Sequence, residues 1–149
     1  MTNCWLAPDG KCLKKPPEGY YGFVYLITNT VDGRIYIGKK AFSYKRKTKL
    51  SKKAKKATGK RVSVKEVDSQ WLSYFGSSLD IKEDVKKLGP ENFQRNILHF
   101  CTNKAQMNYM EAKEQFARGV LEIGEKSYNK WIGIKCFKSK MITDGSTTK

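Results

Sequence analysis

The sequence predicts a small mixed fold of the α/β (α+β) class, in which a β-hairpin, a third strand and several helices share one core. Two apolar and aromatic runs, residues 21–28 and 34–38, flank Asp32-Gly33 and indicate the hairpin. An Asp-Gly loop favours a tight turn because both residues tolerate positive φ. The third strand is expected over residues 92–100, where apolar and polar side chains partly alternate. At 149 residues, the chain suits one domain with one modest core.

The pairing of the hairpin determines which side chains share a face. With a two-residue loop, Val31 lies opposite Arg34, and Ile27 lies opposite Gly38. Because side chains alternate along a strand, one face then carries four neighbouring residues: Tyr25, Ile27, Tyr36 and Gly38. Two phenols beside a residue without a side chain predict a shallow polar notch that a phosphodiester can enter. The alternative is an amphipathic hairpin in which both tyrosines only pack.

A helix is expected directly after the hairpin. Phe42, Arg46 and Leu50 are spaced at i, i+4 and i+8, which places them on one side of a helix. An arginine on an apolar stripe is either a surface residue with a buried stem or a charge directed at a ligand.

Two further helices are predicted by their caps. Asp80 and Glu83 form a capping-box-like pair before a helix that ends at Gly89-Pro90. A second box opens a helix over residues 103–121, whose apolar side includes two acids, Glu111 and Glu114. A buried carboxylate needs a partner or a metal. Pairing with a lysine at the surface is the alternative to a metal.

The charge of the chain predicts a polyanionic partner. The formal net charge is +16, with 30 Lys and Arg against 14 Asp and Glu, and the pI is near 9.7. Nucleic acid is the expected partner. An anionic membrane surface ranks second, but no stretch is long and apolar enough to span a bilayer.

Residues 45–66 form a basic insertion. Its first part, KRKTKLSKKAKKATGKR, contains no acid and one large apolar residue, Leu50. A self-repelling, flexible segment that orders on contact is expected. Such cations bind backbone phosphates with strong salt dependence and without reading bases. The predicted phosphate contacts are Lys45, Lys47, Lys49, Lys52, Lys53, Lys55, Lys56, Lys60 and Arg61.

The flanks are expected to lie outside the folded domain of residues 20–137. Residues 1–19 are interpreted as a lead-in arm anchored by Trp5 and Leu6, and residues 138–149 as a polar tail. No secretory signal is recognised, so a cytoplasmic location with reduced thiols is expected. The cysteines at positions 4, 12, 101 and 136 lack the Cys-x-x-Cys spacing of zinc sites. Cys101 is expected to be a small buried residue; a zinc site assembled from all four in space is the alternative.

Several segments together resemble the GIY-YIG nuclease family. The second tripeptide, Tyr36-Ile37-Gly38, matches intact, whereas the first, Phe23-Val24-Tyr25, departs at two positions. Arg46 stands eight positions after Gly38, where the family carries an arginine on a helix. The ordered segments DSQWLSYFGSS, NFQRNIL and NYMEAKEQF resemble the phage-type, homing-endonuclease-like branch.

The resemblance implies a small three-stranded antiparallel sheet flanked by helices and a metal-dependent hydrolysis of DNA phosphodiesters. Glu111 matches the glutamate that holds one divalent ion, usually Mg²⁺, and Glu114 is its rival. One carboxylate plus substrate oxygens and water suits that ion. The remaining implied site residues are Tyr25, Tyr36, Lys39, Arg46 and Asn129, with Gly38 leaving room for substrate. Arg46 would neutralise phosphate charge at the transition state.

One departure concerns the residue that activates water. Many relatives carry a His or Tyr in or after the first helix, where this sequence has Leu50 or residues near Gly76. The base is therefore expected to be Tyr36, with Tyr74 second, provided that nearby cations lower its pKa.

The functional hypotheses are ordered accordingly. The first is a small DNA endonuclease, of homing type or degrading host DNA, located in the host cytoplasm if phage-encoded. The alternative is a non-catalytic basic nucleic-acid-binding protein on a degenerate nuclease fold; a basic assembly protein has little support. Because no separate DNA-reading module follows Asn129, strong specificity would require the arm, the insertion or a homo-oligomer.

Overall fold

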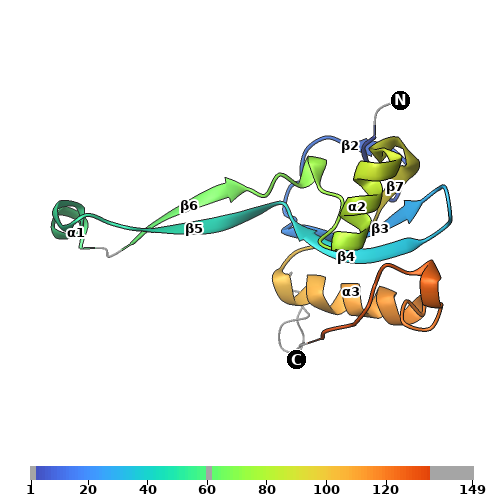
Figure 1. The fold of residues 1–149 in the computed structure, drawn as a ribbon. Helices are drawn as coiled ribbons and strands as arrows, with labels where there is room; N and C mark the ends of the chain where they lie inside the picture. Colours follow the sequence, from blue (N-terminus) through green and yellow to red (C-terminus); the bar gives the residue numbers. More distant parts are fainter. Residues whose placement is uncertain (1–2, 60–61, 135–149) are drawn as a thin grey trace.

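The body of the protein is a five-stranded mixed sheet with α2 (Leu79–Leu88) on one side and α3 (Lys104–Ala117) on the other, as the computed structural model shows for residues 3–59 and 62–134 (Figure 1). The strand order is β2-β1-β7-β3-β4. The strands are β1 (Trp5–Leu6), β2 (Cys12–Leu13), β3 (Gly22–Asn29), β4 (Ile35–Ala41) and β7 (Phe93–Cys101). Short 3-10 turns lie at η1 (Trp71–Ser73), η2 (Pro90–Asn92) and η3 (Gly124–Lys126).

The predicted three-stranded antiparallel sheet is present as β7-β3-β4, but it is only part of a larger, five-stranded sheet. The amino-terminal residues add β1, which pairs in parallel with β7, and β2, which pairs with β1. Trp5 of β1 is fully buried, and its indole donates to the backbone oxygen of Trp71 at 2.7 Å. The expectation of a lead-in arm outside the fold is therefore wrong, because burial of this large side chain ties the segment to the sheet.

A disulfide links Cys4 to Cys12 across the β1–β2 ribbon, with the Cα atoms 5.7 Å apart. The expectations of reduced thiols and of a four-cysteine zinc site are wrong for this pair. Cys101 is buried as predicted, and burial raises its pKa to about 11. Cys136 and the predicted tail, residues 138–149, lie outside the described residues.

The hairpin forms, but its loop is longer than expected. Asn29 and Arg34 close a four-residue loop, residues 30–33, through a 2.8 Å bond from the Asn29 N–H to the Arg34 oxygen. The buried side chain of Asn29 accepts the Val31 N–H at 2.9 Å, which fixes this turn. Tyr25 therefore pairs with Gly38 rather than Ile27 with Gly38. Because the register shifts by two residues, the predicted face is preserved.

The sheet has an apolar cluster on each face. One cluster gathers aromatic residues beneath η1 and α2, including Phe23, Tyr25 and Trp71. The other cluster lies under α3 and includes Val24, Ile37 and Met107. Figure 1 shows the sheet between the two helices. Side chains of β4 therefore point alternately towards α2 and towards α3, so this strand at the edge of the sheet can supply groups to a site from both faces.

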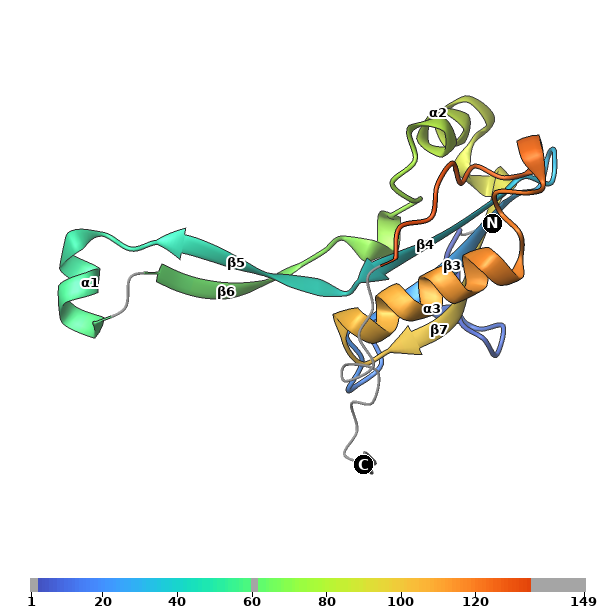
Figure 2. The same ribbon diagram turned by 90° about the horizontal axis from the view of Figure 1, so that it is seen from below.

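A long arm projects from the body between β4 and η1 (Figures 1 and 2). It consists of β5 (Ser43–Lys49), α1 (Lys52–Thr58) and β6 (Val62–Asp68), with β5 and β6 paired antiparallel. Ser51 caps α1 by accepting the Ala54 N–H, and Gly59 ends it at φ +73°. The predicted flexible insertion thus has regular structure in the described residues, which exclude Lys60 and Arg61.

The helix predicted over residues 42–50 is wrong, because this stretch is strand β5. Tyr44 and Thr48 favour a strand, and they lie opposite Val67 and Ser63 of β6. Local i, i+4 spacing gave no information about this partner, which is distant in sequence.

The other two predicted helices form. The Asn103 side chain accepts the Gln106 N–H at 2.7 Å, as expected for the cap of α3. Helix α2 ends at Gly89, but Asp80 does not cap its start, because Ser78 holds the N-cap position and Asp80 lies within the first turn. The Asp80 carboxylate pairs with Lys130 instead. Within residues 3–59 and 62–134, no helix combines the length and apolar character that crossing a bilayer requires.

Candidate active site

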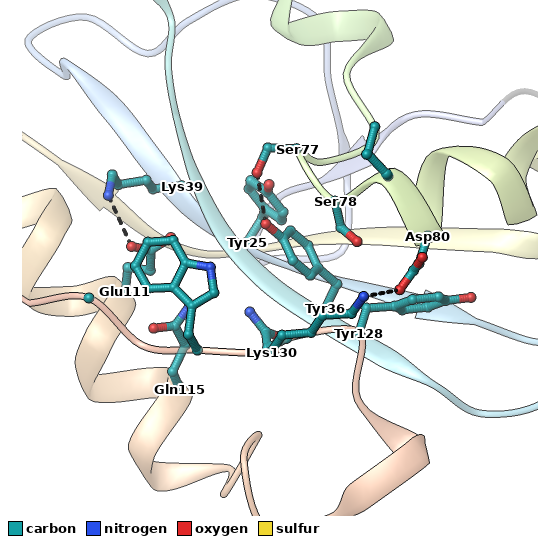
Figure 3. A pocket seen from close by; sticks show the side chains of 14 residues that line it. Tyr25, Tyr36, Lys39, Ser77, Ser78, Asp80, Glu111, Gln115, Tyr128 and Lys130 are labelled. Atoms are coloured by element: carbon teal, nitrogen blue, oxygen red, sulfur yellow. Dashed lines mark hydrogen bonds and ion pairs between the residues drawn. The ribbon is translucent and has the colours of Figure 1, made fainter.

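A cavity of about 580 Å³ opens beside β4, between the start of α2, helix α3 and residues 128–133 (Figure 3). Five of the site residues implied by the resemblance line it: Tyr25, Tyr36, Lys39, Glu111 and Asn129. These residues come from β3, β4, α3 and the segment after η3, so the fold gathers them from four separate parts of the chain.

Tyr25 lies at the base of this cavity with its ring against Gly38. Its side chain is 1% exposed, and a Cβ atom at Gly38 would lie 2.3 Å from the phenol oxygen. Gly38 was expected to leave room for substrate. The structure shows that this room is filled by the phenol of Tyr25, which any larger residue at position 38 would displace.

The second phenol, Tyr36, is positioned by the loop before α2. Its hydroxyl lies 2.9 Å from the Ser77 hydroxyl, and its ring centroid lies 6.2 Å from that of Tyr25. Gly76, at φ +92°, brings the loop against the Tyr36 ring, since a Cβ atom there would approach Cε2 to 3.1 Å. Sequence reasoning missed Ser77. The Gly-Ser-Ser break before α2 marked the loop but not its approach to β4.

Both phenols keep their protons at neutral pH. Burial raises the pKa of Tyr25 well above its ordinary value, and the neighbouring Tyr74, Tyr36 and Glu111 raise it further. Burial also raises the pKa of Tyr36, although its hydrogen bond to Ser77 acts in the opposite direction. The prediction that cations lower the pKa of one tyrosine is therefore wrong for the protein alone. Neutral phenols donate hydrogen bonds, which suits contacts to anionic oxygens.

Glu111 projects from α3 into the cavity and pairs with Lys39 of β4. The distance between Lys39 Nζ and Glu111 Oε1 is 3.0 Å, and the Glu111 side chain is 14% exposed. Its rival Glu114 does not line the cavity. The Glu114 carboxylate instead contacts His99 Nε2 at 2.6 Å and Arg118 Nε at 3.3 Å. The geometry therefore favours Glu111 as the acid of the site.

Asn129 holds β4 in place from outside the sheet. Its side chain accepts the Ile37 N–H and donates to the Ile37 oxygen, both at 2.9 Å. Gln115 of α3, which the sequence analysis missed, also donates to that oxygen at 3.1 Å. These bonds satisfy backbone groups that the edge of a sheet leaves unpaired, and they fix the strand that carries Tyr36 and Lys39.

Lys130 and Asp80 form the outer wall of the cavity. Their 2.9 Å ion pair links the segment after η3 to the start of α2 (Figure 3). Neither residue was predicted to belong to the site, because only the folded chain brings them together.

Arg46 is not at this site. It lies in the middle of the exposed strand β5, opposite Lys65, and does not line the cavity formed by the described residues. The expected placement beside the phenols is wrong because it depended on the helix that is strand β5. Tyr74, the second candidate base, lies behind Tyr25 with ring centroids 6.0 Å apart and lines a neighbouring cavity.

The donor set of the cavity fits one hard cation that keeps most of its water. No group of three or more His, Cys, Asp and Glu side chains gathers anywhere in residues 3–59 and 62–134. Glu111 supplies one carboxylate, with one oxygen on Lys39. Mg²⁺ binds proteins through one or two carboxylates and retains several waters, so this set suits Mg²⁺. The described residues that line the cavity include no Cys or His, the side chains that softer metals prefer.

Paired phenols and a lysine–glutamate pair line one open cavity of a strongly basic protein, which is the arrangement that the resemblance to a small nuclease implies. The family model described as "Putative endonuclease segE, GIY-YIG domain" matches residues 5–132, and the chain belongs to this GIY-YIG endonuclease family. A relative named "Putative endonuclease segD", from Enterobacteria phage T4, is 32% identical over 89 residues. This match covers 60% of the chain and 29% of the relative, so the similarity spans under a third of that protein. No solved structure matches the chain.

Proposed function

We propose that the protein is a divalent-metal-dependent endonuclease that hydrolyses DNA phosphodiester bonds in the cavity beside β4. The observation that carries this proposal is the convergence of residues that the resemblance names: Tyr25, Tyr36, Lys39, Glu111 and Asn129 line one cavity. Membership of the GIY-YIG family supports the same activity and a divalent-metal requirement.

Glu111 would hold the metal ion. When bound, Mg²⁺ would supply positive charge to the phosphate oxygens and to the leaving oxygen. Among the described residues, the cavity is lined by two acidic side chains, Glu111 and Asp80, and each is paired with a lysine. Glu111 is the one that matches the family glutamate, and its side chain is the less exposed of the two, at 14% against 46%. Glu111 would therefore carry this role alone, with water completing the coordination.

The other residues would bind and orient the phosphate. Tyr25 and Tyr36 present neutral hydroxyl groups, which can donate to phosphate oxygens and orient the attacking water. Lys39 would neutralise phosphate charge, the role expected of Arg46, because its ammonium already faces the cavity. Fixed donors aimed at developing charge stabilise a transition state without reorganisation. Asn129 would act as a positioning residue that holds β4.

The arm would hold the DNA backbone. Its cations project from both strands and from α1, and the acids among its described residues are Glu66 and Asp68. Exposed Lys side chains on phosphates release counterions and bind many sequences alike. Arg46 belongs to this surface. The proposed contacts among the described residues are Lys45, Arg46, Lys47, Lys49, Lys52, Lys53, Lys55 and Lys56.

Nicking of supercoiled plasmid tests the proposal. The purified protein is expected to convert plasmid to open-circular or linear DNA with Mg²⁺ and to leave it intact with EDTA. Tyr36→Phe and Lys39→Met should reduce the rate while keeping the mobility shift of DNA. A mobility shift without cleavage under any divalent metal would overturn the enzyme proposal and favour a non-catalytic DNA-binding protein.

A further inference from the structure

A second cavity of about 460 Å³ lies at the root of the arm, on the α2 side of the sheet. Lys40 at the end of β4 and Lys82 in α2 both line it, and we call it the Lys40–Lys82 cavity. The other lining residues lie in and around η1, except for one that lies in α2, and they are Ser69, Gln70, Ser73, Tyr74, Phe75, Gly76 and Val85.

The charge of this cavity is positive and unbalanced. None of its lining residues is acidic. Within the described part of the chain, neither Lys40 nor Lys82 forms an ion pair. Acids that directly adjoin lining residues along the chain, such as Asp68 and Glu83, are not part of the lining, and Asp68 accepts the Gln70 N–H at 2.5 Å. Burial and the charge of Lys82 lower the pKa of Lys40, so the two ammonium groups repel each other in the absence of an anion.

The wall of the cavity positions Lys40. Its Nζ atom lies 4.1 Å from the centroid of the Tyr74 ring, a cation–π contact that holds the charge in place. Gln70 takes the left-handed conformation at φ 60°, which among the described residues no other non-glycine residue does. A strained backbone of this kind persists where the surrounding structure fixes it, and it is frequent at ligand sites.

Tyr74 separates this cavity from the candidate active site. The Tyr74 ring meets the Tyr25 ring edge-on, at 82° between planes and 6.0 Å between centroids. The loop before α2 borders both spaces, since Gly76 lines the second cavity and Ser77 lines the first. A DNA strand that runs from the active site to the arm would therefore pass over Lys40 and Lys82.

We propose that the Lys40–Lys82 cavity binds a second backbone phosphate of the DNA strand whose scissile phosphate lies in the active site. This proposal rests on the proposed nuclease function. Two ammonium groups compensate the phosphate charge, while the hydroxyls of Ser69 and Ser73 already donate to the backbone oxygens of Ala41 and Gln70. The contact sets the register of the strand between the active site and the arm.

Binding of a short fluorescent DNA duplex tests the proposal independently of cleavage. Lys40→Met and Lys82→Met are each expected to weaken binding several-fold and to reduce the slope of log K against log salt by about 0.9. Lys86→Met and Lys87→Met, in the last turn of the same helix and outside the cavity, are the matched controls. Lys40→Arg, which keeps the charge, should keep the affinity, and thermal unfolding checks that each variant is folded.

Single methylphosphonate substitutions locate the contact. Wild-type protein should lose affinity when one phosphate near the cleavage position is neutralised, and Lys40→Met should be insensitive to that same substitution. Equal effects of Lys40→Met, Lys82→Met and the two controls would overturn the proposal even if the protein cleaves DNA. Equal sensitivity of wild type and Lys40→Met at every position would also overturn it. A third outcome separates the two proposals. If neither the wild type nor any variant cleaves DNA but the predicted differences in affinity are observed, the nuclease proposal is overturned and the Lys40–Lys82 cavity remains a phosphate-binding site.

Discussion

The ammonium of Lys39 and the carboxylate of Glu111 meet at 3.0 Å across the cavity beside β4. The pair joins the edge strand to α3, and the Glu111 side chain is less exposed than that of Lys39, at 14% against 35%. A phosphate and a divalent cation would each take one partner of this pair, so the two ligands should bind better together than alone.

The single exposed tryptophan reports on the cavity. Trp5 and Trp71 are 0% and 1% exposed, whereas Trp131 is 74% exposed and lines the cavity. Quenching of the protein fluorescence by acrylamide should therefore arise mainly from Trp131, and DNA bound at the cavity should reduce it. In Trp131→Phe, acrylamide should quench little with or without DNA. Unchanged quenching of the wild type at saturating DNA would place the DNA elsewhere.

Arg46 should contribute to affinity and not to chemistry. It lies on β5, directly opposite Lys65. Like charges opposite each other destabilise a sheet unless an anion intervenes. Arg46→Ala is expected to weaken DNA binding several-fold while leaving the single-turnover rate at saturating DNA within about threefold, because rim charges act mainly on encounter. A rate loss at saturation as large as that of Lys39→Met would restore Arg46 to the active site.

The lysines of α1 should hold DNA without reading its sequence. A quadruple change to Gln at Lys52, Lys53, Lys55 and Lys56 should weaken binding to unrelated duplexes alike and flatten the salt dependence by about 0.9 per lost contact. Fluorescence anisotropy over a range of salt concentrations measures both effects.

The control for this variant replaces with Gln four exposed lysines that lie outside the arm, the active-site cavity and the Lys40–Lys82 cavity: Lys11, Lys14, Lys15 and Lys104. It carries the same net charge as the α1 variant. If the two variants lose affinity equally, the effect belongs to net charge, and the arm has no special role. Loss at only one DNA sequence would show that the arm reads bases.

Residues close in sequence could be predicted well. The hairpin face with Tyr25 and Tyr36 emerged from alternation alone, although the loop was two residues longer than expected. The buried Asn29 side chain, which hydrogen-bonds the Tyr128 hydroxyl at 3.0 Å, selects that longer loop. Its partner lies far away in the chain, so no local pattern could reveal it.

Features that depend on distant partners were missed. The 42–50 spacing fits a helix, but Arg46 lies in a strand because β6 pairs with it from residues 62–68. Trp5 was recognised as an anchor, but its parallel pairing with β7 requires a strand some 90 residues later. Glu111 could not be separated from Glu114 until the structure showed their partners on β4 and β7.

Tyr128 should make the fold sensitive to alkali. Burial, together with the 2.6 Å hydrogen bond that it donates to Asp84, raises its pKa to about 12. An unfolded tyrosine ionises near pH 10. Between pH 10 and 12 the folded state thus keeps a proton that the unfolded state loses. Tyr128 therefore contributes about 2 to 3 kcal/mol to the free energy of unfolding below pH 10, and this stability is lost as the pH rises to 12.

Urea unfolding at pH 8 to 11.5 measures this effect. The free energy of unfolding of the wild type should fall more steeply above pH 10 than that of Tyr128→Phe. This variant should be less stable at pH 8, because Asp84 and Asn29 lose a buried hydrogen-bond partner. Parallel curves for the two proteins would mean that Tyr128 titrates alike in both states.

The single-turnover cleavage rate of Glu111→Gln at saturating DNA and Mg²⁺ tests the central claim most directly. Glu114→Gln is the matched control, since it lies one turn further along α3 with its carboxylate on His99 and Arg118. We expect Glu111→Gln to lose about 10²-fold or more in rate with DNA affinity retained, and Glu114→Gln to cleave close to the wild-type rate. Cleavage by Glu111→Gln at the wild-type rate would contradict the account, because the cavity beside β4 would then not be where DNA is hydrolysed.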